Sequence, residues 1–116
     1  PWMSACFGDA ISNDAVERNH RFLEESLELV QSTGCTQSEA HQLVDYVYSR
    51  PAGKTEQEVG GTMLTLSALC SCIDVDMQIA GENELVRVWT NIAKIREKTN
   101  LKPDAAASAH GASPAK

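Results

Sequence analysis

Several features that mark particular classes of protein are scarce in this sequence of 116 residues. Basic side chains number 10 against 16 acidic ones, and the net charge of -6 argues against broad nucleic-acid binding, because phosphate-backbone binding needs a basic face. The four cysteines form no CxxC pair and no histidine stands at zinc-finger spacing, so reduced structural thiols are expected instead of a zinc site. No apolar run approaches the roughly 18 residues of a membrane span, and no charged-then-apolar leader opens the chain. These absences predict a cytoplasmic protein without nucleic-acid or membrane partners.

Strand signals are also missing, whereas helical signals are frequent. No segment shows the two-residue alternation of a strand, no internal repeat is visible, and aromatic residues make up only 5% of the chain. Capping-box patterns or single capping acids mark four helix starts, at Asp14, Thr36, Thr55 and Asp74 or Asp76. Apolar side chains then recur at helical spacing, so the predicted helices span about residues 14–32, 36–49, 55–73 and 76–99. We therefore predict an all-α bundle of four helices whose third helix, apolar nearly all round, is the most buried.

The two ends of the chain lack this helical pattern. Residues 1–13 contain a turn-like Gly8-Asp9 pair and no sustained period, so we expect an irregular arm that carries Trp2 and Phe7. From Leu101 the sequence LKPDAAASAHGASPAK has too few large side chains to offset the entropy of ordering it. We predict one helical domain over residues 1–100 and a flexible tail over residues 101–116.

Three glutamates are crowded into one apolar segment, HRFLEESLELVQ at residues 20–31. With Glu24 at 0° on a helical wheel, Glu25 falls at about 100° and Glu28 at about 40°, so the three carboxylates share one sector. Apolar side chains flank both edges, and grouping like charges between surfaces that favour burial is unfavourable unless a cation is supplied. Mg²⁺ or Mn²⁺ would serve, because hard divalent ions prefer carboxylate oxygens and keep water and substrate phosphates in their other positions. Glu58, in the first turn of the third helix, is the candidate that would complete the site.

The same acids can be explained without a metal. Glu58 can be only the last member of its capping box, and the three glutamates can pair with Arg18, Arg21 or a lysine. Most acidic clusters are simply solvated. The charge pattern alone leaves both interpretations open.

Basic side chains lie near the acidic sector. Arg21 and Arg18 fall at about 60° and 120° on the same wheel, while Lys94 and Lys98 share one face of the fourth helix with Arg87. Cations beside a carboxylate cluster that holds a metal suit a polyphosphate ligand. Salt bridges within the helix and ordinary solvation of the lysines explain the pattern equally well.

The segments FLEESLELVQ, EQEVGGTMLTLSALC and IDVDM resemble the MazG-like, all-α nucleoside triphosphate pyrophosphohydrolases over roughly residues 17–98. That family carries an EExxE segment on one helix and an ExxD segment on a later one. Glu24, Glu25 and Glu28 match the first segment, and Glu58 matches the first acid of the second. Gly61 stands where the family has its aspartate. A water molecule, Glu24 or Asp76 would have to replace that ligand, or the site is impaired.

The resemblance implies a function as well as a fold. It implies Mg²⁺-dependent cleavage of a (d)NTP to the (d)NMP and pyrophosphate, for nucleotide-pool control. The wording ERNHRFLEE and EVGG is similar to a branch of small MazG-like proteins from phages and bacteria, some of which resemble deoxypurine triphosphate hydrolases, so dATP or dGTP is the expected substrate. Glu25, Glu28 and Glu58 would hold the metal, and Glu24 would be a further ligand or the base for the attacking water, so Glu24 and Glu25 are the catalytic candidates. The candidates for substrate binding are Arg18, Arg21, Lys94, Lys98 and Trp2.

Two further points of this interpretation have alternatives. Trp2 can stack on a purine, or it can pack over a neighbouring helix or subunit. Members of the family generally pair helices between subunits, which implies a homodimer or a dimer of dimers. The alternative function is a non-catalytic helical module that binds a metal or a nucleotide. Gly61 favours the module, whereas the retention of three repelling acids favours the enzyme.

Overall fold

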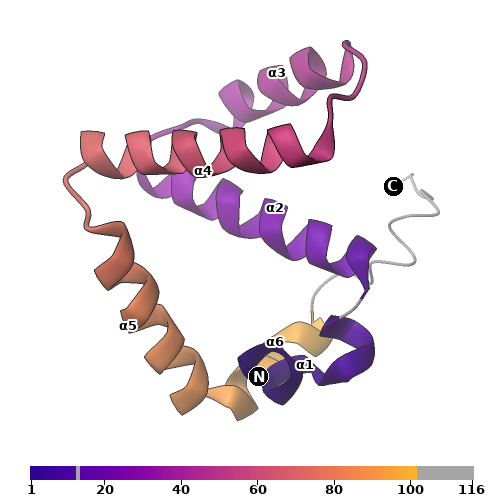
Figure 1. Ribbon diagram of the computed structural model, residues 1–116, viewed down its shortest axis with the longest axis vertical. Coiled ribbons are helices and arrows are strands. Elements are labelled where there is room, and N and C mark those ends of the chain that lie inside the picture. Colours follow the sequence, from indigo (N-terminus) through magenta and orange to yellow (C-terminus); the bar gives the residue numbers. More distant parts are fainter. Residues whose placement is uncertain (13, 102–116) are drawn as a thin grey trace. The chain divides into compact units, whose positions relative to one another are not determined.

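The computed structural model describes residues 1–12 and 14–101, and these residues form helices joined by short connections (Figure 1). The helices are α1 (Trp2–Ser12), α2 (Ala15–Ser32), α3 (Gln37–Tyr48), α4 (Thr55–Cys72), α5 (Met77–Thr90) and α6 (Ile92–Leu101). No strand occurs within the described ranges, so the predicted all-α class is confirmed. The predicted tail lies outside the described residues, apart from Leu101, which ends α6.

Six helices are described where four were expected, because the chain differs from the prediction at two places. The N-terminal arm is helical on both sides of Gly8, where the backbone leaves the helical region at φ 81° and ψ 163°. The predicted helix over residues 76–99 is divided into α5 and α6 at Asn91. The side-chain amide of Asn91 donates to the carbonyl of Arg87 at 2.9 Å. The backbone N–H of Asn91 donates to the same carbonyl at 3.0 Å, so the side-chain bond adds to the helical bond at Arg87 and does not replace it.

The helices divide into two compact units, and each is described by itself. The first unit is Pro1–Thr36 with the chain from Arg87 onward, and it contains α1, α2 and α6. The second unit is Gln37–Val86, with α3, α4 and most of α5. In the first unit α1 packs against both α2 and α6, and Cys6 of α1 is only 1% exposed. The arrangement of the helices as one bundle remains a prediction.

The helices α2 and α4 end in the same kind of turn, the Schellman motif. In each turn the two residues after the C-cap donate backbone hydrogen bonds to carbonyls in the last turn of the helix. The bonds run from Gly34 to Gln31 at 3.2 Å, from Cys35 to Val30 at 2.9 Å, from Asp74 to Ser71 at 3.4 Å and from Val75 to Cys70 at 2.9 Å. Gly34 and Asp74 hold the matching position, with φ of 103° and 58°.

The match extends beyond the turns to the flanking helices. Both α2 and α4 have 18 residues. The spacing of the helices is also the same. The helix α2 runs from Ala15 to Ser32 and α3 starts at Gln37, and at the same spacing α4 runs from Thr55 to Cys72 and α5 starts at Met77. The chain therefore repeats one helix–turn–helix segment, although the sequence shows no repeat, because the likeness lies in helix length and backbone bonding and not in the side chains.

The helix α4 carries much apolar surface but is not buried. Cys70 is its one buried residue in the described chain, whereas Val59, Met63 and Leu64 are 56%, 67% and 74% exposed. The prediction that this helix is the most buried is therefore wrong. A helix that is apolar all round is buried only if neighbours cover every side, and the described chain leaves these side chains uncovered. No single helix of the described residues is long and apolar enough to cross a membrane, although α4 and α5 meet that test as a bent pair.

Candidate functional site

The predicted acidic residues lie on α2, whose start is capped by Asp14 as predicted. The Asp14 carboxylate accepts hydrogen bonds from the backbone N–H groups of Val16 at 3.0 Å and Glu17 at 3.2 Å. These groups have no partner inside the helix, so the cap stabilises its first turn. The helix then continues without a break to Ser32. This regular geometry keeps the three glutamates of the EExxE segment in one sector, as the wheel predicts.

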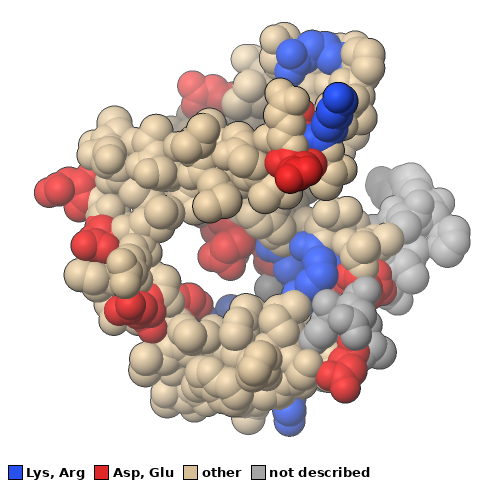
Figure 2. Space-filling model, in the orientation of Figure 1, with Lys and Arg blue, Asp and Glu red and all other residues tan. Residues whose placement is uncertain are grey.

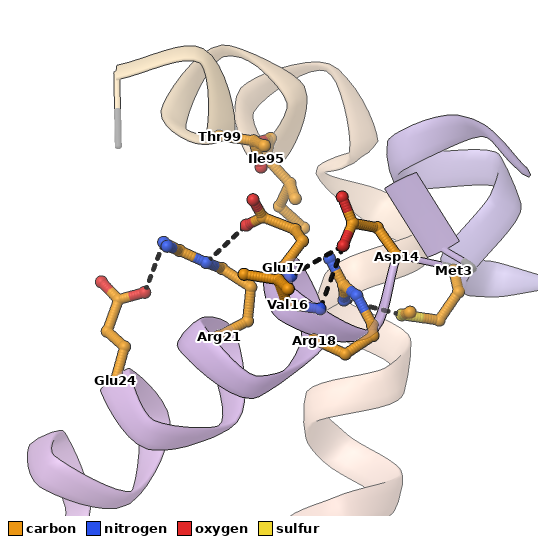
Figure 3. Close-up of polar contacts among 9 residues, drawn as sticks. All are labelled: Met3, Asp14, Val16, Glu17, Arg18, Arg21, Glu24, Ile95 and Thr99. Atoms are coloured by element: carbon orange, nitrogen blue, oxygen red, sulfur yellow. Dashed lines mark hydrogen bonds and ion pairs between the residues drawn. The ribbon is translucent and has the colours of Figure 1, made fainter. Parts of the chain in front are cut away.

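Arg21 holds one of these glutamates in an ion pair (Figure 3). Its Nη1 lies 3.1 Å from Glu24 Oε1, and its Nε lies 2.8 Å from Glu17 Oε1. The Nε–H of Arg21 is not aligned for a hydrogen bond with Glu17, so that contact is electrostatic. The side chains of Arg21 and Glu17 are each 16% exposed, against 36% for Glu24. Pairing with arginine, one of the explanations that the sequence left open, therefore applies to Glu24.

The other two acids of the cluster are unpaired. Glu25 and Glu28 are exposed, and neither makes an ion pair or a hydrogen bond within the part of the chain that the structure describes. They stand three positions apart, so their carboxylates leave the helix on neighbouring turns. The flanking apolar side chains are uncovered as well, since Phe22 and Leu23 are 59% and 55% exposed. The acids are thus not enclosed between buried surfaces, and two accessible carboxylates are free to accept a cation.

The donor set on α2 suits Mg²⁺ in a particular mode of binding. No group of three or more His, Cys, Asp or Glu side chains stands ready as a metal cage in residues 1–12 and 14–101. Mg²⁺ commonly takes only one or two carboxylates and completes its octahedron with water and substrate phosphates. Glu25 and Glu28 can supply these two carboxylates, whereas Glu24 is held by Arg21, and its role as a further ligand stays a prediction.

Glu58 lies at the start of α4, in the second unit. The N-cap of α4 is Lys54, whose side chain makes no capping bond, and the N–H of Glu58 donates to the Lys54 carbonyl at 3.0 Å. The predicted capping box at Thr55 is therefore wrong, because the helix begins one residue earlier and Thr55 is already inside it. The Glu58 carboxylate folds back over Gly53, where an added Cβ would overlap Glu58 Oε2. Since each unit is described by itself, the approach of Glu58 to the acids of α2 remains a prediction.

Gly61, which stands where the family has its aspartate, lies on an open side of α4. A Cβ built on Gly61 would meet no atom of the described chain within 4 Å, and the same is true of Gly60. Close packing of a neighbouring described helix therefore does not require this glycine. Asp76, a possible replacement ligand, accepts a hydrogen bond from the N–H of Ile79 at 3.0 Å and so caps α5, as predicted.

The remaining substrate-binding candidates on α6 and α1 belong to the first unit. Lys94 and Lys98 are exposed and stand four positions apart, so they share one face of α6. Arg87 belongs to α5, and the predicted wheel relation between it and the lysines ends at the break. Trp2 packs edge-on against Phe7, with ring centroids 6.3 Å apart. This contact lies within α1, so the packing of Trp2 over a neighbouring helix or subunit stays a prediction, as does stacking of its exposed part on a purine.

Arg18 is enclosed in a way that the sequence pattern does not indicate. Its guanidinium lies 5.2 Å from the centre of the Phe7 ring. Its Nη1 contacts Met3 Sδ at 3.4 Å, as Figure 3 shows. Its Nε and Nη2 atoms are buried without a hydrogen-bond partner. Because Met3 and Phe7 come from α1, whose helical structure is not predicted, only the packing of α1 on α2 reveals these contacts.

The first unit thus brings Arg18, Arg21 and the EExxE glutamates together on α2, with the lysines on α6 and Trp2 on α1 in the same unit. Comparisons of the chain with protein-family models, with curated proteins and with solved structures give no match. The function is therefore inferred from the chemistry of these side chains.

Proposed function

We propose that the chain catalyses Mg²⁺-dependent hydrolysis of a (d)NTP, with dATP or dGTP as the expected substrate, to the (d)NMP and pyrophosphate. The observation that carries the proposal is the pair of exposed, unpaired carboxylates of Glu25 and Glu28 on a helix whose preceding turns carry Arg18 and Arg21. Unpaired carboxylates can bind a divalent cation, and neighbouring guanidinium groups can bind phosphate oxygens. The arrangement therefore suits a ligand that combines a divalent cation with phosphates. Such an activity would control a cytoplasmic nucleotide pool.

The side chains have separate roles in this reaction. Glu25 and Glu28 would hold the cation, and Glu58 is the further ligand that the resemblance implies. Mg²⁺, when bound, neutralises charge on the leaving pyrophosphate and lowers the pKa of a nearby water. The water oxygen bonds to the α-phosphorus, the bond from that phosphorus to the bridging oxygen breaks, and the pyrophosphate leaves with the bridging oxygen. Glu24, positioned by its ion pair with Arg21, accepts the proton of the water.

The substrate is held by cations and an aromatic ring. Arg18, Arg21, Lys94 and Lys98 would contact the phosphate oxygens. The exposed part of Trp2 would stack on the purine. The exposed lysines would mainly attract the negatively charged substrate toward the site. They would add little binding free energy, because an ion pair exposed to water is weak.

A product assay tests this function. The chain is incubated with each of the eight common NTPs and dNTPs in Mg²⁺ and in Mn²⁺, and NMP is resolved from NDP. We expect a deoxypurine monophosphate and pyrophosphate. Glu25→Gln and Glu28→Gln should each lower kcat/KM by at least about 10- to 100-fold, which is the typical effect of losing a residue that only supports a metal ligand. Glu97→Gln, which removes the same charge from an exposed site on α6, is the matched control and should change little. An NDP product, or turnover unaffected by both glutamine variants, would contradict the proposal.

The alternative function is a non-catalytic helical module that binds a metal or a nucleotide. Gly61 favours it, because the family's aspartate is missing from a position where a side chain would find open space. Calorimetric binding of Mg²⁺ or of a nucleotide, without turnover of any of the eight substrates, would identify the module.

We also infer that the chain forms a homodimer or a dimer of dimers. No charged residue occurs from Val59 to Ile73, and the visible face of α4 shows no Lys, Arg, Asp or Glu along most of its length (Figure 2). Met63 and Leu64 are among its most exposed residues. An uncharged face with exposed large apolar side chains commonly marks a protein interface. A second copy of α4 fits it, because two uncharged faces meet without repulsion.

A further inference from the structure

Arg18 is a half-buried cation whose guanidinium has no carboxylate partner among the residues that the structure describes. Arginine remains charged in proteins, and shielding its N–H groups from water without an acceptor is unfavourable. The Met3 thioether is a weak acceptor, and the Phe7 ring attracts the charge without accepting the Nε and Nη2 hydrogens. An oxyanion would satisfy both groups with charge-assisted hydrogen bonds.

The part of α1 that precedes Gly8 lies against the guanidinium of Arg18. The Nε and Nη2 atoms of Arg18 have essentially no contact with solvent. Met3 and Phe7, which lie against the guanidinium, both precede Gly8 in α1. Movement of the segment from Trp2 to Phe7 away from α2 would remove both contacts and expose the guanidinium to an oxyanion.

That segment is attached in a way that allows such movement. The break at Gly8 deprives the carbonyls before it of the N–H donors that a continuous helix would supply. Arg96 of α6 takes their place, because its Nε donates to the carbonyl of Cys6 at 3.2 Å and its Nη2 donates to the carbonyl of Ala5. Gly8 has a positive φ of 81°, which glycine adopts readily, so it can act as a hinge. Arg96 and Gly8 thus control how the segment before Gly8 packs against the rest of the first unit.

We propose that residues Trp2–Phe7 form a hinged cover over Arg18, which opens when a polyphosphate group replaces Met3 and Phe7 on the guanidinium. The identity of the ligand rests on the proposed function. The movement itself requires neither a metal nor hydrolysis. The cover shields the guanidinium of Arg18 from water until phosphate oxygens provide the missing hydrogen-bond acceptors. Binding of the polyphosphate and opening of the cover are therefore coupled.

The thiol of Cys6 provides a direct measure of opening. Cys6 lies in the cover and is 1% exposed, whereas Cys72 of the second unit is exposed. Alkylation by iodoacetamide, followed by peptide mass spectrometry, gives the rates at both thiols in the same chain. We expect inorganic pyrophosphate, without added metal, to raise the rate at Cys6 several-fold relative to Cys72. Arg18→Gln should abolish this response, whatever its effect on the rate without ligand.

Two further variants complete the test. Arg50→Gln is the matched control, because Arg50 also lies over an aromatic ring, 4.3 Å from the centre of Tyr46, but in the second unit. It should leave the response unchanged. Arg96→Gln should raise the Cys6 rate without ligand and tighten pyrophosphate binding, because part of the closure is already undone. Circular dichroism verifies that each variant is folded, and Arg96→Gln tests the cover even if Arg18→Gln unfolds.

The outcomes separate the cover from the enzyme. If calorimetry shows pyrophosphate binding while the Cys6 rate stays constant, the cover is refuted. It is also refuted if neither the native chain nor Arg96→Gln binds pyrophosphate. If Cys6 responds to pyrophosphate but no nucleotide is hydrolysed, the cover stands and the proposed catalysis fails.

Discussion

Gly61 is the residue at which metal binding and packing can be tested together. It lies one helical turn after Glu58, and a Cβ added at Gly61 would meet no described atom within 4 Å. We predict that Gly61→Asp tightens Mg²⁺ binding in the absence of nucleotide, because a second carboxylate beside Glu58 replaces a water ligand. Gly61→Ala, the matched control, should leave metal binding unchanged and raise the free energy of unfolding by about 0.5–1 kcal/mol, as alanine favours a helix over glycine. Calorimetry and urea unfolding measure the two effects.

The opposite pattern would assign Gly61 to packing. If both variants lose stability and Gly61→Asp gains no metal affinity, an element or a second subunit must fill the open side of α4. The fourth ligand would then have to be Glu24, Asp76 or water, or the catalytic proposal would lose support.

Residues that act locally are predicted well from the sequence, and residues that act across the fold are not. Asp14 and Asp76 cap α2 and α5 as predicted, because a cap depends only on neighbouring N–H groups. Thr55 does not cap α4, since the chain begins the helix one residue earlier. The contacts of Arg18 with Phe7, and of Arg96 with the carbonyl of Cys6, join distant segments, so no local pattern announces them.

At the scale of elements, the two Schellman turns place different residues in the same left-handed position. Gly34 adopts this conformation at little cost, whereas Asp74 pays a steric penalty and puts a negative charge at the C-terminus of α4. We predict that Asp74→Gly raises the free energy of unfolding by about 0.5–1 kcal/mol. Gly34→Ala should lower it by about 1 kcal/mol. Urea unfolding of both variants measures these changes.

A third variant separates the two causes at this turn. Asp74→Asn removes the charge but keeps a residue that tolerates positive φ. We expect it to recover only part of the stability that Asp74→Gly gains. If Asp74→Gly is less stable than the native chain, the Asp74 side chain must make a stabilising contact that outweighs its backbone strain.

The elements themselves are only partly predictable, for reasons that differ along the chain. The starts of α2 and α3 agree with the prediction, because the capping-box patterns at Asp14 and Thr36 coincide with the apolar period there. The break at Asn91 escapes prediction, since the apolar period continues across it from Val88 to Ile95. The helix before Gly8 escapes as well, because its stability depends on packing against α6 and not on its own pattern.

At the scale of the whole molecule, the proposed site combines local and long-range parts. The grouping of Glu24, Glu25 and Glu28 follows from helical geometry alone, so the sequence predicts it. The participation of Glu58 depends on how the chain outside α2 is arranged, and a wheel contains no such information. The exposure of Met63 and Leu64 is likewise a property of the assembled chain. This exposure leads us to predict that a second subunit covers α4.

We predict that Leu64→Lys converts a dimer into a monomer, because a buried lysine without a partner is unfavourable at an interface. Leu64 is 74% exposed in the single chain, so the same substitution would otherwise change little. Tyr48→Lys on α3, where the native side chain is 84% exposed, is the matched control and should preserve the dimer. Sedimentation equilibrium of the three chains gives the masses. A monomeric native chain would refute the predicted dimer. A native dimer that Leu64→Lys leaves intact would place the interface elsewhere, and the apolar surface of α4 would then have to be covered by another partner.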